Sequence, residues 1–272
     1  KCYDEHLSRD PFNFNAWYNR GIVPNRRGEY EKSVQSYEMA LAINEVFPSA
    51  WYNIGNAYAN LGKLDDAINC FKTTLKYEPA DVPAWHNLAN AYEELSRFED
   101  AIFAFTNAIK HDANHSESYF GRGCCWDALN KPKKALVDYK KALTITSDYA
   151  ELWYARADAE YNLGKHDECI ESYKMVLKLD PSNAEAWYDY GDTLGEMGLF
   201  FKALEVLEES IKLSPKFGPS HYSRGKVLLM LGDNEGAIES MKTAFEFEPE
   251  LKELFKSEFP GFRRPFSRIL KK

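Results

Sequence analysis

The fold is decided by a stretch that recurs along the chain, and its clearest copy is residues 50–71, AWYNIGNAYANLGKLDDAINCF. Counting outward from Trp51, an aromatic residue or a histidine returns every 34 residues in both directions. The series consists of Trp17, Trp51, Trp85, Tyr119, Trp153, Trp187 and His221. A fixed period of this length indicates an array of structural repeats, each of which buries its apolar face against its neighbours.

Seven repeats of 34 residues follow from this spacing, and they cover residues 14–251. We number positions within a repeat so that the tryptophan occupies position 4. Position 1 is then held by Phe14, Pro48, Val82, Ser116, Ala150, Ala184 and Gly218. Positions 8 and 20 hold small residues, whereas position 24 is large and mostly aromatic. Because closely packed helices place large side chains opposite small ones, this pattern predicts two helices in each repeat.

The ends of the two helices are marked by glycine and proline. Apolar residues spaced by three, four and seven form one stripe over positions 4–11 and a second over positions 20–27, as helices require. Five repeats have glycine at position 15, where a first helix would end in a turn. Four repeats have proline at position 32, which would stop the second helix.

This pattern resembles the tetratricopeptide repeat, whose W-x2-L-G-x2-Y, A-x3-F and P landmarks are matched most fully by residues 50–71. The resemblance covers residues 14–251 and recurs in all seven repeats. It implies an all-α fold, a right-handed α-solenoid of antiparallel helix pairs. It also implies that the first helix of each pair lines a concave groove, with positions 2, 5, 6, 9, 12 and 13 turned into it.

The residues outside the seven repeats extend the same pattern. Residues 1–13 are predicted to be the end of a truncated preceding repeat, because Asp10 and Pro11 occupy its positions 31 and 32. Residues 252–260 are predicted to form a C-terminal capping helix over the last apolar face. Residues 261–272 form a basic tail with five positive charges and no negative one. We therefore expect this sequence to be a fragment of a longer repeat array.

Composition excludes several classes of protein. The formal net charge of −8 disfavours nucleic-acid binding through a generally basic surface. Membrane insertion is not expected, because the longest charge-free stretch, residues 46–62, contains a proline and three asparagines. Five cysteines are too few for a disulfide scaffold in a chain of 272 residues. They favour a reducing compartment, and the cytoplasm is the predicted location.

Catalytic and cofactor motifs are missing from the sequence. Its glycines fall in turn and packing positions or in the tail, so no phosphate-binding loop is present. His111 and His115 are separated by a repeat boundary, which argues against a shared metal ion. Cys124 and Cys125 are adjacent and lack a CxxC spacing, so they are interpreted as packing residues. We expect neither an enzyme nor a cofactor or metal site.

Asparagine is concentrated in the predicted groove of the first three repeats. The residues are Asn19, Asn53 and Asn87 at position 6, and Asn56 and Asn90 at position 9. An amide side chain both donates and accepts, so it can pair with the backbone of an extended peptide whatever the peptide's sequence. The position 6 series resembles the asparagine ladder of the O-linked N-acetylglucosamine transferase and kinesin light-chain arrays, and it stops at Gly121. The alternative is that asparagine is merely a tolerated polar residue on an exposed helix face.

Acidic residues dominate the same positions in repeats three to six, where lysine and arginine are absent. The acidic candidates are Glu94, Asp127, Asp158, Asp189 and Asp192. Aromatic residues run through both halves at position 5, among them Tyr52, Tyr154 and Tyr188. Like charges along a concave surface repel one another, so their presence suggests a partner with a basic segment. The tyrosines offer cation–π sites to lysine or arginine.

The function predicted from these positions is a non-catalytic protein–protein interaction scaffold that binds an extended or partly helical peptide segment. A clamp for a C-terminal carboxylate would need lysine or arginine at positions 2, 5 and 6, where this chain has tyrosine, glutamate or asparagine. The alternative is a substrate-recruiting arm of a larger enzyme or complex whose catalytic part lies outside the sequence. Self-association is left open by the sequence.

Repeat one departs from the pattern. Pro24 occupies position 11, inside the predicted first helix, and Arg27 replaces the leucine or methionine found at position 14 in the other repeats. Proline removes a backbone donor and crowds the carbonyl four residues earlier. We therefore expect the first helix of repeat one to end early or to kink.

Overall fold

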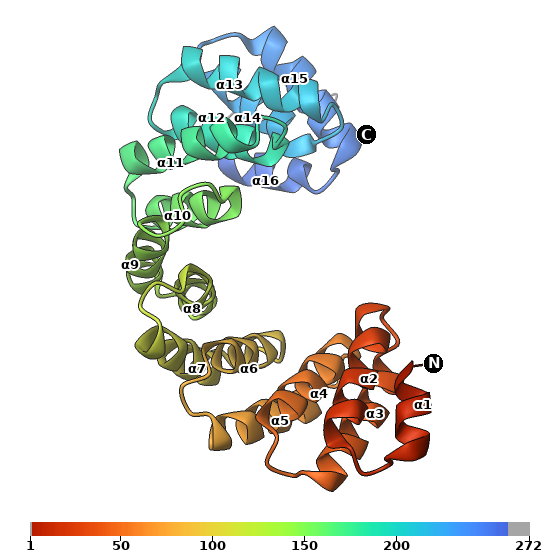
Figure 1. The fold of residues 1–272 in the computed structure, drawn as a ribbon. Coiled ribbons are helices and arrows are strands. Elements are labelled where there is room, and N and C mark those ends of the chain that lie inside the picture. Colours follow the sequence, from red (N-terminus) through yellow and green to blue (C-terminus); the bar gives the residue numbers. More distant parts are fainter. Residues whose placement is uncertain (1, 261–272) are drawn as a thin grey trace. The chain divides into compact units, whose positions relative to one another are not determined.

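The computed structural model describes residues 2–260, so the basic tail predicted at residues 261–272 lies outside the described residues. Over the described range the chain forms sixteen helices and no strand. Consecutive helices pack in pairs, which confirms the predicted all-α fold (Figure 1). The chain divides into two compact units, residues 1–147 and residues 148–272. Each unit is described by itself.

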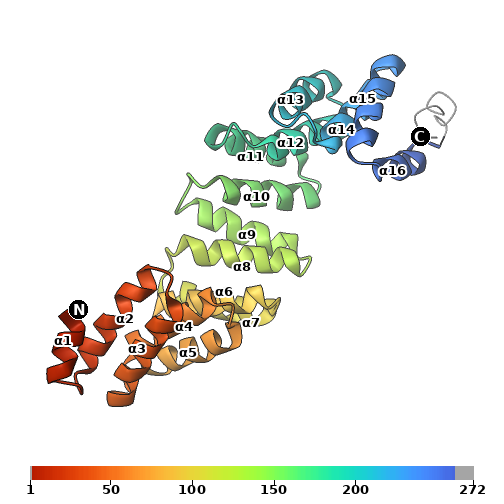
Figure 2. The ribbon, with the colours of Figure 1, turned by 90° about the vertical axis from the view of Figure 1, so that its right-hand side faces the viewer.

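The first unit contains the first four repeats and the helix before them (Figure 2). Its helices are α1 (Cys2–Arg9), α2 (Phe14–Arg26), α3 (Tyr30–Ile43), α4 (Pro48–Asn60), α5 (Leu64–Tyr77), α6 (Val82–Glu94), α7 (Phe98–His111), α8 (Ser116–Ala128) and α9 (Pro132–Leu143). Even-numbered helices α2 to α8 are the first helices of their repeats. Each packs most extensively on the helix that follows it and then on the one that precedes it.

The second unit contains the last three repeats and a terminal helix. Its helices are α10 (Ala150–Asn162), α11 (His166–Leu179), α12 (Ala184–Glu196), α13 (Phe200–Leu213), α14 (Gly218–Met230), α15 (Asn234–Phe247) and α16 (Leu251–Glu258). Helix α16 packs against α14 and α15. Its Phe255 is fully buried, with the ring centroid 6.0 Å from that of Phe245, so the apolar face of α15 is covered.

The tryptophan series is explained by a hydrogen bond to the preceding repeat. The indole Nε1 of Trp85 donates to the carbonyl oxygen of Pro79 at 2.8 Å, and Trp187 donates in the same way to Pro181 at 3.0 Å. In repeat seven the Nε2 of His221 lies 2.9 Å from the carbonyl oxygen of Pro215. In these repeats the contact ties the first helix to the loop before it, which is why histidine can replace tryptophan at position 4.

Position 8 carries no side chain in five repeats because an aromatic or large apolar side chain lies against the helix there. A Cβ atom on Gly55 would lie 2.6 Å from the ring of Phe71 at position 24. Alanine is present instead at Ala89 and Ala157, both fully buried. The small-to-large pattern in the sequence therefore corresponds to direct contact between the two helices of one repeat.

The expectation that Pro24 ends the first helix early is wrong. Helix α2 runs to Arg26, which is the same repeat position at which α4 ends. Proline keeps its carbonyl group, and the backbone N–H of Glu29 donates to the oxygen of Pro24 at 3.0 Å. The equivalent bond in repeat two joins Lys63 to Tyr58 at 2.9 Å. The C-terminal turn thus forms with or without a donor at position 11.

No helix in the described part of the chain combines the length and the apolar character needed to cross a lipid bilayer.

Candidate functional site

Position 5 of one repeat is joined to position 6 of the next by hydrogen bonds between side chains. In the first unit the Nδ2 of Asn53 donates to the hydroxyl oxygen of Tyr18 at 2.9 Å. One repeat further, the Nδ2 of Asn87 donates to the hydroxyl oxygen of Tyr52 at 3.0 Å. The predicted asparagine series and the predicted tyrosine series are therefore one interacting network between first helices.

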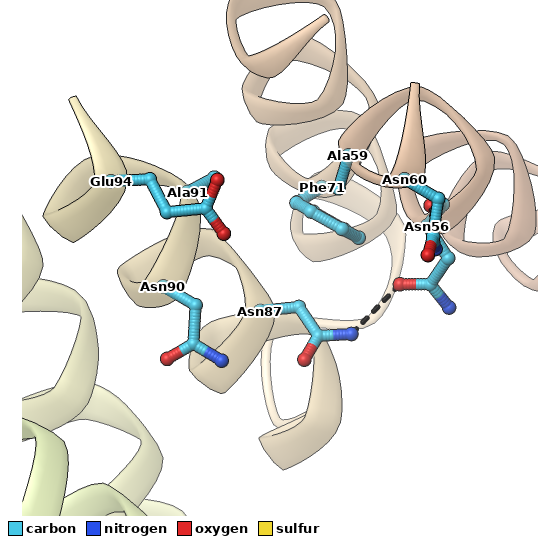
Figure 3. Close-up of a pocket in the computed structure, with 8 residues that line it drawn as sticks. All are labelled: Asn56, Ala59, Asn60, Phe71, Asn87, Asn90, Ala91 and Glu94. Atoms are coloured by element: carbon cyan, nitrogen blue, oxygen red, sulfur yellow. Dashed lines mark hydrogen bonds between the residues drawn. The ribbon is translucent and has the colours of Figure 1, made fainter. Parts of the chain in front are cut away.

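A pocket of about 260 Å³ lies between α4 and α6 in the first unit. Figure 3 shows its lining residues, which are Asn56, Ala59, Asn60, Phe71, Asn87, Asn90, Ala91 and Glu94. Four of the eight are asparagines. Four of the residues predicted to bind peptide, Asn56, Asn87, Asn90 and Glu94, are brought together here.

Inside this pocket the amide groups have fixed orientations. Asn87 donates through Nδ2 to the Oδ1 of Asn56 at 2.8 Å (Figure 3). The same Nδ2 also donates to Tyr52. An amide nitrogen carries two hydrogens, so both hydrogens of Asn87 are engaged. The groups that remain for a ligand are the amide nitrogen of Asn56 and the amide oxygen of Asn87. They place a donor beside an acceptor, which matches the C=O and N–H of a peptide backbone.

The asparagine series stops at Gly121 for a packing reason. A Cβ atom at that residue would lie 2.4 Å from the ring of Phe105, so no side chain fits. The preceding position 5 residue is His86, whose Nδ1 lies 3.1 Å from the hydroxyl oxygen of Ser118. Burial lowers the pKa of His86 to about 4. This histidine is therefore a neutral packing residue at physiological pH, and it interrupts the tyrosine–asparagine network.

In the second unit the same network is built with carboxylates. The hydroxyl of Tyr154 donates to the Oδ2 of Asp189, which again joins position 5 to position 6 of the next repeat. Tyr173 donates to the Oδ1 of Asp158 at 3.0 Å. The acids predicted to attract a basic partner thus also accept hydrogen bonds from tyrosines within the fold.

The carboxyl group of Asp189 is strongly perturbed by its surroundings. Burial, with the nearby negative charges of Asp158, Glu185 and Asp192, raises its pKa from the usual 3.8 to about 7, although the hydrogen bond from Tyr154 opposes the shift. When several carboxylates lie together in a site that is partly shielded from water, the charged form of each is destabilised. The charge of this site therefore changes near neutral pH.

A second pocket, of about 290 Å³, lies beside this network in the second unit. It is formed by α10, by the first turn of α12 and by the loop between α11 and α12. Its lining residues are Ala150, Glu151, Tyr154, Ala155, Asp158, Asp180, Asn183 and Glu185. Four carboxylates and one tyrosine face the same space, and no lysine or arginine lines it.

Asp192 is partly neutralised by a residue that the sequence interpretation missed. The Nζ of Lys226 lies 3.2 Å from the Oδ1 of Asp192, and the hydroxyl of Ser223 donates to the same oxygen at 2.6 Å. Lys226 occupies position 9 of repeat seven, one repeat beyond the acidic run. Extending the comparison of position 9 to the last repeat would have found it.

The remaining predicted residues lie apart from the two pockets. Asp127 accepts a hydrogen bond from Tyr139 at 2.6 Å, and burial raises its pKa. The ring of Tyr188 packs edge-on against Phe217 with centroids 5.4 Å apart. Asn19 is half-buried on α2 and lines neither pocket.

Groups of three or more histidine, cysteine, aspartate or glutamate side chains with metal-binding geometry do not occur among residues 2–260. Burial raises the pKa of Cys125 above its ordinary range and that of Cys169 to about 12, so these thiols stay protonated.

Family models for the tetratricopeptide repeat match most of the array. A model described as TPR repeat matches residues 25–62 and 157–198. Two models described as Tetratricopeptide repeat match residues 48–81 and 82–115, and residues 184–217. Together these segments span more than half of the chain. A search of curated proteins finds no significant match.

Solved structures share the fold at low sequence identity. YrrB, described as a TPR protein with an unusual peptide-binding site, has a TM-score of 0.63 at 21% identity, covering 69% of this chain and 96% of its own. A tetratricopeptide repeat protein from Parabacteroides merdae gives 0.62 at 20% identity, covering 89% and 97%. The C-terminal part of a TPR repeat-containing protein from Cytophaga hutchinsonii gives 0.73 at 14% identity, covering 85% and 95%.

The raised pKa of Asp189 predicts a pH-dependent stability. The folded state holds this proton up to about pH 7, whereas the unfolded chain loses it near pH 3.8, so folding becomes less favourable as pH rises between these values. Asp189→Asn keeps an acceptor for Tyr154 and removes the charge. The variant should lack this loss of stability. The difference in unfolding free energy between the variant and the parent protein should therefore change in favour of the variant by about 1 kcal/mol or more from pH 5 to pH 8.

Urea denaturation at several pH values measures this difference. Glu185→Gln is the matched control, because Glu185 contributes charge nearby but is exposed. It should show a much smaller pH-dependent gain. Equal pH dependence for Asp189→Asn and the parent protein would show that Asp189 titrates normally.

Proposed function

We propose a peptide-binding function for this chain, which belongs to the tetratricopeptide repeat family. Its fold implies a protein–protein interaction scaffold. We propose that the asparagine pocket of the first unit binds the backbone of an extended peptide. We further propose that the acidic pocket of the second unit binds a lysine or arginine side chain of a peptide ligand. The proposed location is the cytoplasm, in keeping with the few, scattered cysteines.

The observation that carries the proposal is the paired amide of Asn56 and Asn87. Their mutual hydrogen bond and the bond from Asn87 to Tyr52 hold the two side chains in one arrangement before any ligand arrives. A preorganised donor and acceptor cost less entropy to use than mobile ones. Backbone recognition of this kind is compatible with many peptide sequences. The description of YrrB as a TPR protein with a peptide-binding site supports a peptide as the ligand class.

The acidic pocket supports the second half of the proposal. Glu151, Asp158, Asp180 and Glu185 line a space in which one wall is Tyr154. A lysine or arginine side chain would meet carboxylates at its charged end and the tyrosine ring along its length. Asp158 accepts a hydrogen bond from Tyr173, which holds its carboxylate at the wall of this pocket. Charge in this pocket would therefore select basic segments.

Selection from a random peptide library displayed on phage, followed by fluorescence anisotropy of the enriched peptides, tests the backbone site. Asn56→Ala with Asn90→Ala should weaken binding by about tenfold or more, since each lost hydrogen bond costs about 1 kcal/mol. Because the amides contact backbone, the loss should be similar for peptides that differ only in side chains over that segment. Asn69→Ala with Asn107→Ala, on α5 and α7, is the matched control and should leave affinity unchanged. A loss restricted to one peptide sequence would contradict backbone recognition.

The acidic pocket has its own test with the same peptides. Asp158→Asn with Glu185→Gln removes two charges while keeping an acceptor for Tyr173. Affinity for peptides that contain lysine or arginine should fall by about fivefold or more and become less dependent on salt, because charge attraction is screened over roughly 8 Å at physiological ionic strength. Peptides in which these residues are replaced by glutamine should bind both proteins equally. If basic and neutral peptides lose affinity alike, charge selection is wrong.

A further inference from the structure

Helix α9 differs from the other second helices in the charge of its exposed face. It carries Lys133, Lys134, Lys140 and Lys141, and all four are exposed. Its one acid, Asp138, is buried and forms a bidentate pair with Arg122, at 2.6 and 2.8 Å, so it does not offset the lysines. On a chain with net charge −8, this is a concentrated basic surface.

An apolar side chain lies at the centre of this surface. Val137 is 67% exposed, and the four lysines occupy the positions three and four residues before and after it. That spacing places them around the valine on one face of the helix. Lys131 and Lys134 extend the surface over the ring of Trp126, with Nζ 5.3 and 4.2 Å from the ring centroid. We call these residues the α9 face.

Two lysines of the α9 face, Lys133 and Lys134, lie where they oppose the stability of the helix, whereas Lys140 and Lys141 in its last turn are favourably placed. Positive charge in the first turn of a helix is unfavourable, because the N-terminal end of the helix dipole is positive. Helices α5, α7, α11 and α15 have acids in their first turn, as this rule favours, whereas α9 has Lys133 and Lys134 there. Among the described residues, no carboxylate lies within 4.0 Å of the Nζ of Lys133, Lys134 or Lys141. Lys134 instead lies over the ring of Trp126, so the charges of Lys133, Lys134 and Lys141 are not neutralised by a neighbouring acid and are available to an external carboxylate.

We propose that the α9 face docks a short acidic segment of a protein partner that presents an apolar side chain among its carboxylates. The carboxylates would pair with the lysines, and the apolar side chain would cover Val137. The net charge of −8 repels a large acidic body at a distance, so attraction acts only locally and favours a short segment. An anionic membrane is disfavoured on the same ground and because one valine offers little apolar area to a bilayer. This surface is separate from the asparagine pocket, which is built on α4 and α6.

The test uses a short synthetic, fluorescein-labelled helical peptide whose glutamates surround one leucine. Lys133→Glu with Lys134→Glu should lower its affinity by about tenfold or more, as expected for close opposite charges. The same change puts acids in the first turn, so the melting temperature should stay equal or rise. Val137→Ser should lower affinity several-fold, and a peptide with serine in place of leucine should not distinguish Val137→Ser from the parent protein.

Two control variants show whether a loss of affinity belongs to the α9 face. Lys174→Glu with Lys212→Glu makes the same charge change on α11 and α13 and should leave affinity unchanged. Asn56→Ala with Asn90→Ala should also have no effect, so failure of the backbone site and failure of the α9 face are distinguishable. Equal loss in the lysine control, or no binding of the peptide by the parent protein, would overturn the proposal. Co-sedimentation with phosphatidylserine vesicles, lost in the α9 variant while the peptide does not bind, would assign the face to membranes instead.

Discussion

The hydrogen bond between position 5 of one repeat and position 6 of the next is the contact on which the candidate binding surfaces depend. Tyr18 with Asn53 and Tyr52 with Asn87 form it in the first unit, and Tyr154 with Asp189 forms it in the second. The side chains proposed to contact a ligand are thereby also side chains that join two repeats. Under that proposal, a substitution such as Asn87→Ala that removes a ligand contact also removes an internal hydrogen bond.

Hydrogen bonds from tyrosines also explain how the second unit can hold several carboxylates close together. Isolated acids would repel one another, yet Asp158 and Asp189 each accept a hydrogen bond from a tyrosine, and Lys226 pairs with Asp192. Hydrogen bonds to a carboxylate stabilise its charged form, whereas burial and neighbouring charges oppose it. At Asp189 the opposing effects are larger, which is why its pKa rises. The acidic pocket therefore combines acids that are internally supported with exposed acids such as Glu151 and Glu185 that have freedom to meet a ligand.

Much of the fold could be predicted because similar packing contacts recur in all seven repeats. Contacts between neighbouring elements explain the tryptophan spacing, the small residues at position 8 and the large residues at position 24. A regular spacing in the sequence therefore indicates a regular stacking of helices. Pro24 misled the prediction because the rule for proline in helix interiors concerns the missing donor. Near the C-terminus of α2 the carbonyl of Pro24 is the group that matters, and proline has one.

The candidate site was less predictable than the fold. Side-chain type and repeat position singled out Asn56, Asn87, Asn90 and Glu94 as candidate binding residues, and the structure brings these four into one pocket. Position alone could not show that both amide hydrogens of Asn87 are already engaged, since that depends on which rotamers the neighbouring tyrosine and asparagine adopt. Nor could it show that the ring of Phe105 fills the place of a side chain at Gly121. These contacts join different positions of neighbouring repeats, so they cannot be seen by comparing the residues at one repeat position.

Tyrosine and asparagine side chains of neighbouring repeats hydrogen-bond to one another beside the candidate site, and this bond should stabilise the fold. A double-mutant cycle with Tyr52→Phe and Asn87→Ala, followed by urea denaturation, measures its contribution. We expect the two substitutions to be non-additive, with a coupling of about 1 kcal/mol in the free energy of unfolding. Strict additivity of the two substitutions would show instead that the hydrogen bond contributes nothing to stability.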